Sequence, residues 1–175
     1  MFEQPWRYLT ELNSVRVISN DNSMVHQGKG FAHHKLNSVV NGATLDYLFV
    51  TPTDKDIHFR SWSIKSSDGP ISITVYEDTV VSANGTSAAI GNNNRQSTIT
   101  PTLSCYTGPT VTGVGNVMMT DFIGATGGGA HIPVGEAASD DTEWLLKKGA
   151  KYLFRITNTS GSTASVVHKF NWYET

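Results

Sequence analysis

Apolar and polar residues alternate in segment after segment of this chain, and this pattern constrains the fold more than any other feature. The clearest examples are residues 57–64, 71–76, 151–157 and 165–173. Successive side chains of a β-strand point to opposite faces, so each segment can bury one face and turn the other outward. The pattern predicts an all-β protein, a two-sheet antiparallel β-sandwich of jelly-roll-like form, with a barrel as the alternative.

Turn-forming residues separate the apolar runs. The best signal for a short hairpin is Asn41-Gly42, and Asn84-Gly85 and Ser160-Gly161 are further turn signals. Other candidate strands are residues 31–40, 43–51, 86–90, 98–106 and 117–123. Asp140–Lys148 has an acidic start and a basic end, which suits either a short helix or a loop that leads into a strand.

Size and composition limit the class of protein. A chain of 175 residues is long enough for one domain with a real core. Only 16% of its residues are charged, compared with about 25% in an average soluble domain, and uncharged polar groups are cheaper to desolvate at an interface. The net charge of −2 without a basic block predicts no nucleic-acid partner.

The chain carries no targeting signal that we recognise. Glu3, Arg7 and Glu11 interrupt the apolar region that a signal peptide would need, and no run approaches the ~18 apolar residues of a membrane helix. Cys105 is the only cysteine, so packing must hold the fold. We therefore expect no membrane partner and synthesis in a reducing cytoplasm.

Residues 1–22 differ from the β-sandwich domain expected over residues 23–175. They form an N-terminal arm that carries Phe2, Trp6 and Tyr8 at a terminus, where chains usually fray. Either the arm folds back and caps the sandwich, or it extends and inserts its aromatic side chains into a neighbouring subunit. Exposed aromatic residues at this density need a cover.

The middle of the chain, residues 76–112, is rich in Gly, Asn, Ser and Thr and nearly free of charge. It is typical of a surface built from strands and long loops. Within it, Tyr76–Gly85 and Tyr106–Gly115 align without gaps, thirty positions apart, and share Tyr, Val, Ser/Thr and Gly. The match is too short to establish a repeat, but it suits two edge strands that leave the sandwich in the same way.

Candidate reactive groups have simpler structural interpretations. His33 and His34 are adjacent on an expected strand, so they point to opposite faces and do not easily share a metal ion. Cys105 in a strand-like run is more typical of a buried, inert thiol than of a nucleophile. We predict no enzyme, no cofactor and no metal site. Trp62 or Tyr76, if exposed, would offer a face for stacking on sugars, whereas core or interface packing is the alternative for both.

The order of several short motifs resembles a known family. The motifs are NGT (84–86), NNNRQST (92–98), TPT (100–102), YTGPTVT (106–112), EWLLKKGAKYLFRITNTSG (143–161) and WYE (172–174). They resemble small virion structural proteins of tailed bacteriophages that decorate or cement the head, over roughly residues 26–174. The resemblance implies a β-sandwich or jelly roll on the outside of an icosahedral shell, with the major capsid protein as partner.

Our hypothesis is a non-enzymatic protein that binds the outer surface of a phage capsid and stabilises it. We expect it to be made in the host bacterial cytoplasm, to reside in the virion and to form a trimer or dimer. The alternative is a tail- or fibre-associated receptor-binding module that recognises cell-surface glycans. The residues expected to contact a partner are Phe2, Trp6, Tyr8, Asn92, Asn93, Asn94, Arg95 and Gln96.

Overall fold

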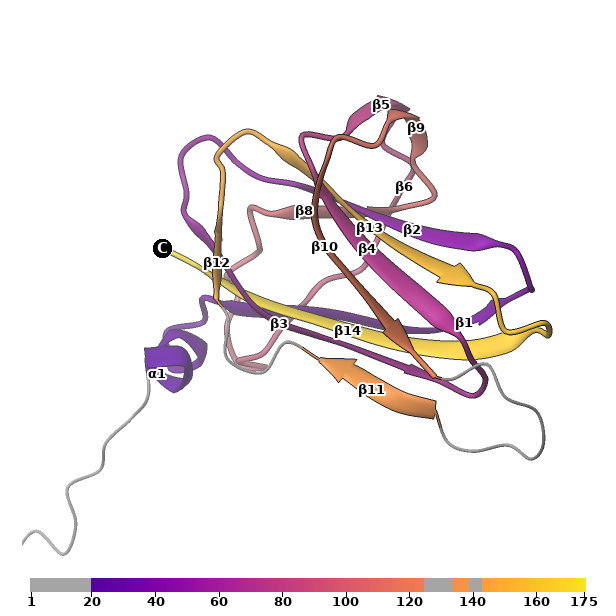
Figure 1. Ribbon diagram of the computed structural model, residues 1–175. Helices are drawn as coiled ribbons and strands as arrows, with labels where there is room; N and C mark the ends of the chain where they lie inside the picture. Colours follow the sequence, from indigo (N-terminus) through magenta and orange to yellow (C-terminus); the bar gives the residue numbers. More distant parts are fainter. Residues whose placement is uncertain (1–19, 125–133, 139–142) are drawn as a thin grey trace, which may run out of the picture.

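Two antiparallel sheets packed face to face form the protein (Figure 1), whose computed structural model describes residues 20–124, 134–138 and 143–175. Sheet A contains, in spatial order, β11 (Val134–Ala138), β3 (Ile57–Ser66), β14 (Ala164–Glu174), β1 (Gly30–Val39) and β7 (Gly91–Asn92), and β12 (Trp144–Leu146) also pairs with β3. Sheet B contains β10 (Asn116–Ile123), β4 (Ile71–Glu77), β13 (Lys151–Asn158), β2 (Thr44–Val50), β8 (Ser104–Thr107) and β6 (Thr86–Ser87). A separate ribbon pairs β5 (Val80–Ala83) with β9 (Thr110–Gly113). The prediction of an all-β antiparallel sandwich is confirmed.

The core between the sheets is built largely from aromatic rings. Strands β4 and β14 bury every second residue, as the alternation predicts. The rings of Phe49, Phe59, Phe154 and Phe170 contact one another, and the Phe154 and Phe170 centroids lie 4.9 Å apart in edge-to-face geometry. Cys105 also lies in this core, and burial raises its thiol pKa to about 12. The thiol is therefore protonated and packs as a small apolar group.

The turn at Asn41-Gly42 exists, but the hairpin predicted from it is wrong. β1 pairs with β14 from Gly30↔Tyr173 to Val39↔Ala164, whereas β2 pairs with β13 in the other sheet. The turn carries the chain from one sheet to the other, and the Gly42 N–H donates to Asn158 O instead of closing a two-stranded ladder. Turn residues fix a reversal of direction, but the packing of each strand's apolar face decides its partner.

The sequence patterns also misplaced some elements. α1 (Asn20–His26) occupies a segment with no predicted helix, and it ends in a Schellman motif at Gly28, where the Lys29 N–H donates to Met24 O. Residues 144–146 form β12, so the helix interpretation of Asp140–Lys148 is wrong there: Leu146 is buried opposite Ile57. The observed strands are shorter than the candidate strands at 86–90 and 98–106, because β6 covers only Thr86–Ser87 and β8 only Ser104–Thr107.

Among the described residues, no helix has the length and apolar character to cross a membrane.

The β5–β9 ribbon forms a third layer on the side of sheet B that faces away from sheet A (Figure 1). Leu48 and Leu153 pair with each other on β2 and β13, and both are fully buried although neither belongs to the cluster between the sheets. Tyr76 flanks Leu153 and Tyr106 flanks Leu48 in register. Strand alternation therefore turns Leu48 and Leu153 toward the face of sheet B on which the ribbon lies.

The two segments that the sequence aligns are related by an approximate two-fold axis. Asn116 pairs with Glu77 on one side, and Thr86 pairs with Thr107 at the equivalent place on the other. Within the ribbon Val81 pairs with Val111, so each segment crosses its counterpart. The prediction that both segments leave the sandwich in the same way is confirmed. The expectation of edge strands is wrong, because β4 and β8 each have a neighbour on both sides.

Candidate functional site

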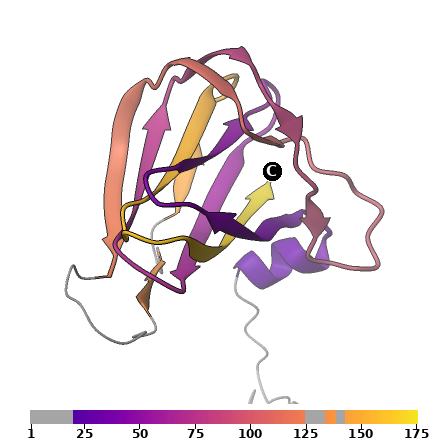
Figure 2. The ribbon, with the colours of Figure 1, turned by 90° about the vertical axis from the view of Figure 1, so that its right-hand side faces the viewer.

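The polar loop Asn92–Gln96 is tied to the end of α1. The Asn92 amide donates to Gly28 O at 2.7 Å, and the Asn94 amide donates to His26 O at 3.1 Å. Figure 2 shows this loop beside α1 and the start of β1. Asn92 and Asn94 therefore hold the loop in place, whereas the exposed Asn93 side chain is left to face outward.

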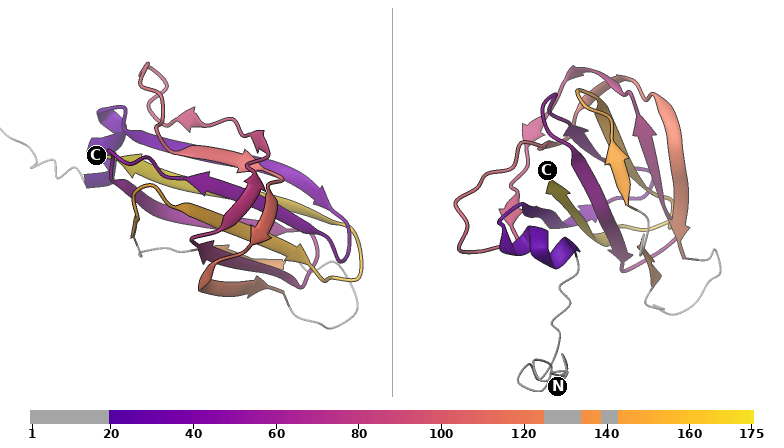
Figure 3. Two further views of the ribbon diagram at one scale, coloured as in Figure 1. Left: turned by 90° about the horizontal axis from the view of Figure 1, so that it is seen from above. Right: turned by 90° about the vertical axis from the view of Figure 1, so that its left-hand side faces the viewer.

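A pocket of about 290 Å³ lies where this loop and α1 meet the outer face of sheet A. Val25 of α1 and Asn93 of the loop line one side, and Arg60, Lys169 and Tyr173 come from the strands beneath. Figure 3 shows α1 and the last residues of β14 at the same end of the molecule. Of the residues predicted to contact a partner, Asn93 is the one that lines this pocket. Phe2, Trp6 and Tyr8 lie outside the described residues.

Glu143 binds three side chains next to the pocket. His58 Nδ1 lies 2.6 Å from Glu143 Oε1, the Tyr173 hydroxyl donates to Oε2 at 3.0 Å, and Arg60 Nη1 donates to the same oxygen at 3.4 Å. The His58 ring stacks on Tyr173 at 4.4 Å. Burial acts to raise the pKa of Glu143, but its hydrogen bonds with His58, Tyr173 and Arg60 outweigh this effect and lower it. Glu143 is therefore an ionised anchor for the residues at the pocket's edge.

The sequence singled out none of these residues except Asn93. Arg60 and Lys169 lie at outward positions of alternating strands, which is the only signal that the sequence holds for them.

Trp62 is 2% exposed, so it offers no face to a sugar, and core packing is confirmed for it. His33 is buried and His34 is exposed, as their adjacency on a strand predicts. Among residues 20–124, 134–138 and 143–175, no three His, Cys, Asp or Glu side chains gather as metal ligands would.

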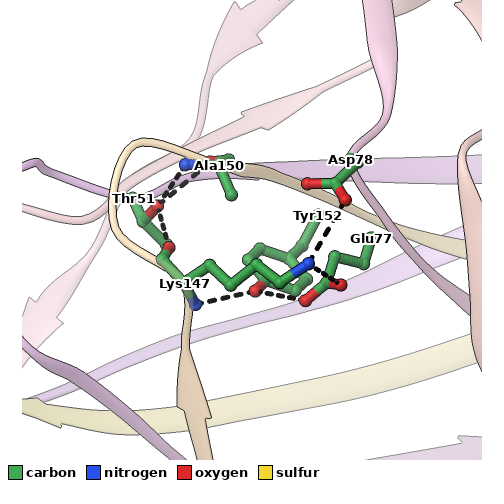
Figure 4. Close-up of polar contacts among 6 residues, drawn as sticks. All are labelled: Thr51, Glu77, Asp78, Lys147, Ala150 and Tyr152. Carbon is green, nitrogen blue, oxygen red and sulfur yellow. Dashed lines mark hydrogen bonds and ion pairs between the residues drawn. The ribbon is translucent and has the colours of Figure 1, made fainter.

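A second polar cluster lies where the loop before β13 meets the end of β4 (Figure 4). Lys147 Nζ lies 2.6 Å from Glu77 Oε1, the Tyr152 hydroxyl donates to Glu77 Oε2, and the hydrogen bond from Lys147 lowers the pKa of Glu77. The Thr51 hydroxyl donates to Lys147 O at 2.7 Å and accepts from the Ala150 N–H. Glu77 and Thr51 are thus engaged within the protein, so the cluster holds these loops together.

Two imidazoles lie inside the sandwich. His168 is fully buried, and its ring centroid is 5.1 Å from that of His33 and 4.2 Å from that of Tyr47. The Nε2 atoms of both histidines have no hydrogen-bond partner among the described residues. His33 Nδ1 contacts Ala89 O at 2.7 Å. Burial lowers the pKa of His168 to about 3 and also lowers that of His33. Both rings are therefore neutral at pH 7.

Strand β10 exposes apolar side chains along the edge of sheet B. Val117 and Phe122 are 62% and 67% exposed, and Met118 is 37% exposed. Phe122 pairs with Ser72 and Thr120 donates to the Thr74 hydroxyl, whereas Asp121 precedes Phe122 within β10 and Glu77 pairs with Asn116 at its start. β10 contains no Lys, Arg or Pro, but it carries Asp121 and a bulge between Val117 and Met119, and charges and bulges are features that limit association at an edge strand.

Comparison with known proteins gives no assignment, because no protein-family model matches the chain and no curated protein matches it significantly.

Proposed function

We propose that this chain is a non-enzymatic virion structural protein that binds the outer surface of a phage capsid and stabilises it. The observation that carries the proposal is the edge strand β10, in which Val117 and Phe122 are more than 60% exposed and Asp121 is the one charged residue. Burial of one such side chain contributes about 1.5–3 kcal/mol, and few charges oppose desolvation there. Repetition on a symmetric shell multiplies modest contacts into firm attachment.

The strand order supports the jelly-roll form that the motif resemblance implies. The two sheets contain eight principal strands, which are β1, β2, β3, β4, β10, β11, β13 and β14. If these eight strands are renumbered from 1 to 8 in chain order, sheet A has the order 1-8-3-6 and sheet B has the order 2-7-4-5. Two interlocked Greek keys give this order, and viral capsid proteins use it repeatedly. We propose the major capsid protein as partner and a dimer or trimer as the oligomeric state, with residence in the virion after synthesis in the host cytoplasm.

The proposal is tested on purified particles and on shells that lack the protein. Quantitative mass spectrometry should give a copy number that is a simple fraction of the shell protein. In sedimentation with empty shells, Val117→Ser/Phe122→Ser should bind at least about tenfold more weakly, because two apolar contacts are lost. Leu36→Ser/Leu145→Ser is the matched control, because these leucines are 64% and 63% exposed on sheet A. Equal binding by both variants would refute the proposed docking strand.

A glycan-binding module of a tail or fibre is the second candidate, and the pocket at Asn93, Arg60 and Lys169 is the observation that favours it. The copy number separates the two candidates. A ratio of a few per cent of the shell protein is expected for a tail or fibre part, and that result would make receptor binding the leading function.

A further inference from the structure

We infer that the pocket on the outer face of sheet A binds a sugar that carries a carboxylate, such as a uronic acid. This inference stands apart from capsid binding, because the pocket lies on sheet A and the proposed docking strand lies at the edge of sheet B.

The charge of the pocket favours an anion. Among the described residues, its lining contains two cations, Arg60 and Lys169, and no carboxylate, although the whole chain has a net charge of −2. No described residue forms an ion pair or hydrogen bond with the side chain of Lys169, which is exposed. Glu143, beside the pocket, is already engaged by His58, Tyr173 and Arg60. Because Arg60 is already paired with Glu143, the exposed Lys169 ammonium is the cation of the pocket that we expect to meet the charge of a carboxylate.

The neutral groups of the pocket favour hydroxyls around that carboxylate. The Asn171 amide donates to Ser61 Oγ at 2.9 Å, which leaves the Ser61 hydroxyl proton and the Asn171 carbonyl oxygen available to a ligand. Asn93 uses its backbone N–H for Gly30 O, and its side-chain amide makes no hydrogen bond with a described residue. Donors and acceptors side by side are what a sugar needs, since each hydroxyl both donates and accepts.

The pocket is held open by the same contacts that fix the loop. A Cβ at Gly30 would lie 2.9 Å from Val25 Cγ2, so α1 packs closely against β1 at this glycine. Asn92 and Asn94 hold the loop that carries Asn93, and Tyr173 is fixed by His58 and Glu143. A site that is formed before the ligand arrives loses little conformational entropy on binding.

The test is a titration of the full-length protein, labelled with ¹⁵N, against D-glucuronate, D-glucose and acetate at low salt. We expect saturable shifts of the Ser61, Asn93 and Asn171 amides with D-glucuronate, and at least tenfold weaker binding of glucose and acetate. Lys169→Gln should weaken glucuronate binding at least tenfold. Lys65→Gln, which removes a cation from sheet A outside the pocket lining, should leave it unchanged.

Three results would overturn the inference. The first is the absence of a saturable shift at the pocket. The second is acetate binding as tight as glucuronate binding, which would mark a simple anion site. The third is that Lys169→Gln and Lys65→Gln weaken glucuronate binding equally. The amide spectrum of each variant also shows whether it is folded, so a failed fold is not mistaken for lost binding. Failure here leaves the sedimentation test of capsid binding unaffected, because that test changes residues of β10.

Discussion

Gly85 and Gly115 occupy equivalent places in two related segments, and each lies against the backbone of the other segment. Their φ angles are +92° and +88°. A Cβ at Gly85 would overlap the carbonyl oxygen of Thr107, and a Cβ at Gly115 would overlap that of Glu77. The pair therefore marks the points where the two halves of the β5–β9 ribbon join sheet B.

Gly85→Ala and Gly115→Ala should destabilise the protein by similar amounts. A left-handed backbone costs an L-residue about 1–2 kcal/mol, and the overlap with a carbonyl oxygen adds to this, so we expect losses of about 2–4 kcal/mol. Gly42→Ala is the matched control, because its φ is +78° but no atom lies within 4 Å of an added Cβ. Urea unfolding measures the three changes, and a loss for Gly42→Ala as large as for the other two would contradict the close approach.

The alternating pattern was sufficient to predict the class of fold, because it depends only on which face of a strand is buried. It does not specify the partner of a strand. β1 and β14 stand at opposite ends of the described sandwich sequence and pair over ten positions, whereas the Asn41-Gly42 turn suggested a local partner. The seven-residue α1 was missed because it is shorter than the segments over which a helical period is visible.

The candidate pocket was less predictable than the fold. Arg60, Asn93 and Lys169 come from β3, a loop and β14, and only the pairing of β3 with β14 and the anchoring of the loop bring them together. Outward charged residues on strands are ordinary, so nothing local distinguished Arg60 and Lys169 from other surface cations. Asn93 was selected as part of an amide-rich loop, and its neighbours Asn92 and Asn94 proved to be structural.

Glu174→Gln should loosen the loop before β8. The buried Glu174 carboxylate accepts hydrogen bonds from the backbone N–H groups of Thr102 and Leu103 and from Trp172 Nε1. A glutamine keeps one acceptor oxygen but turns an NH₂ group toward other donors, so we expect a loss of about 2–3 kcal/mol. Hydrogen exchange should show faster exchange of the Thr102 and Leu103 amides. Asp54→Asn, at an exposed position, is the control and should leave both amides protected.

Deletion of residues 1–19 should weaken attachment to shells at least tenfold or lower the oligomeric state. The two sheets and α1 begin after these residues, so the free energy of unfolding should change by less than about 1 kcal/mol. Replacing Phe2, Trp6 and Tyr8 by serine in the full chain is the companion variant, because it keeps length and charge. Light scattering and sedimentation measure the outcome. Wild-type behaviour of both variants would show that the arm contacts no partner.

Acid should destabilise the protein through its buried imidazoles. An unfolded histidine takes up a proton near pH 6.5, whereas burial lowers the pKa of His168 in the folded protein to about 3. Between these values the unfolded chain binds more protons, so stability present above pH 6.5 is lost as the pH falls. At pH 5 the loss from His168 is about 2 kcal/mol, and the lowered pKa of His33 acts in the same direction.

His168→Phe tests this origin of the acid sensitivity. The phenylalanine keeps a ring beside Tyr47 and Phe170 but cannot be protonated, so the fall in unfolding free energy between pH 7 and pH 5 should shrink by about 2 kcal/mol. His26→Phe is the matched control, because it replaces an exposed histidine by the same residue and keeps both buried imidazoles. Urea unfolding at both pH values gives the comparison. An unchanged slope in His168→Phe would assign the acid sensitivity to other groups.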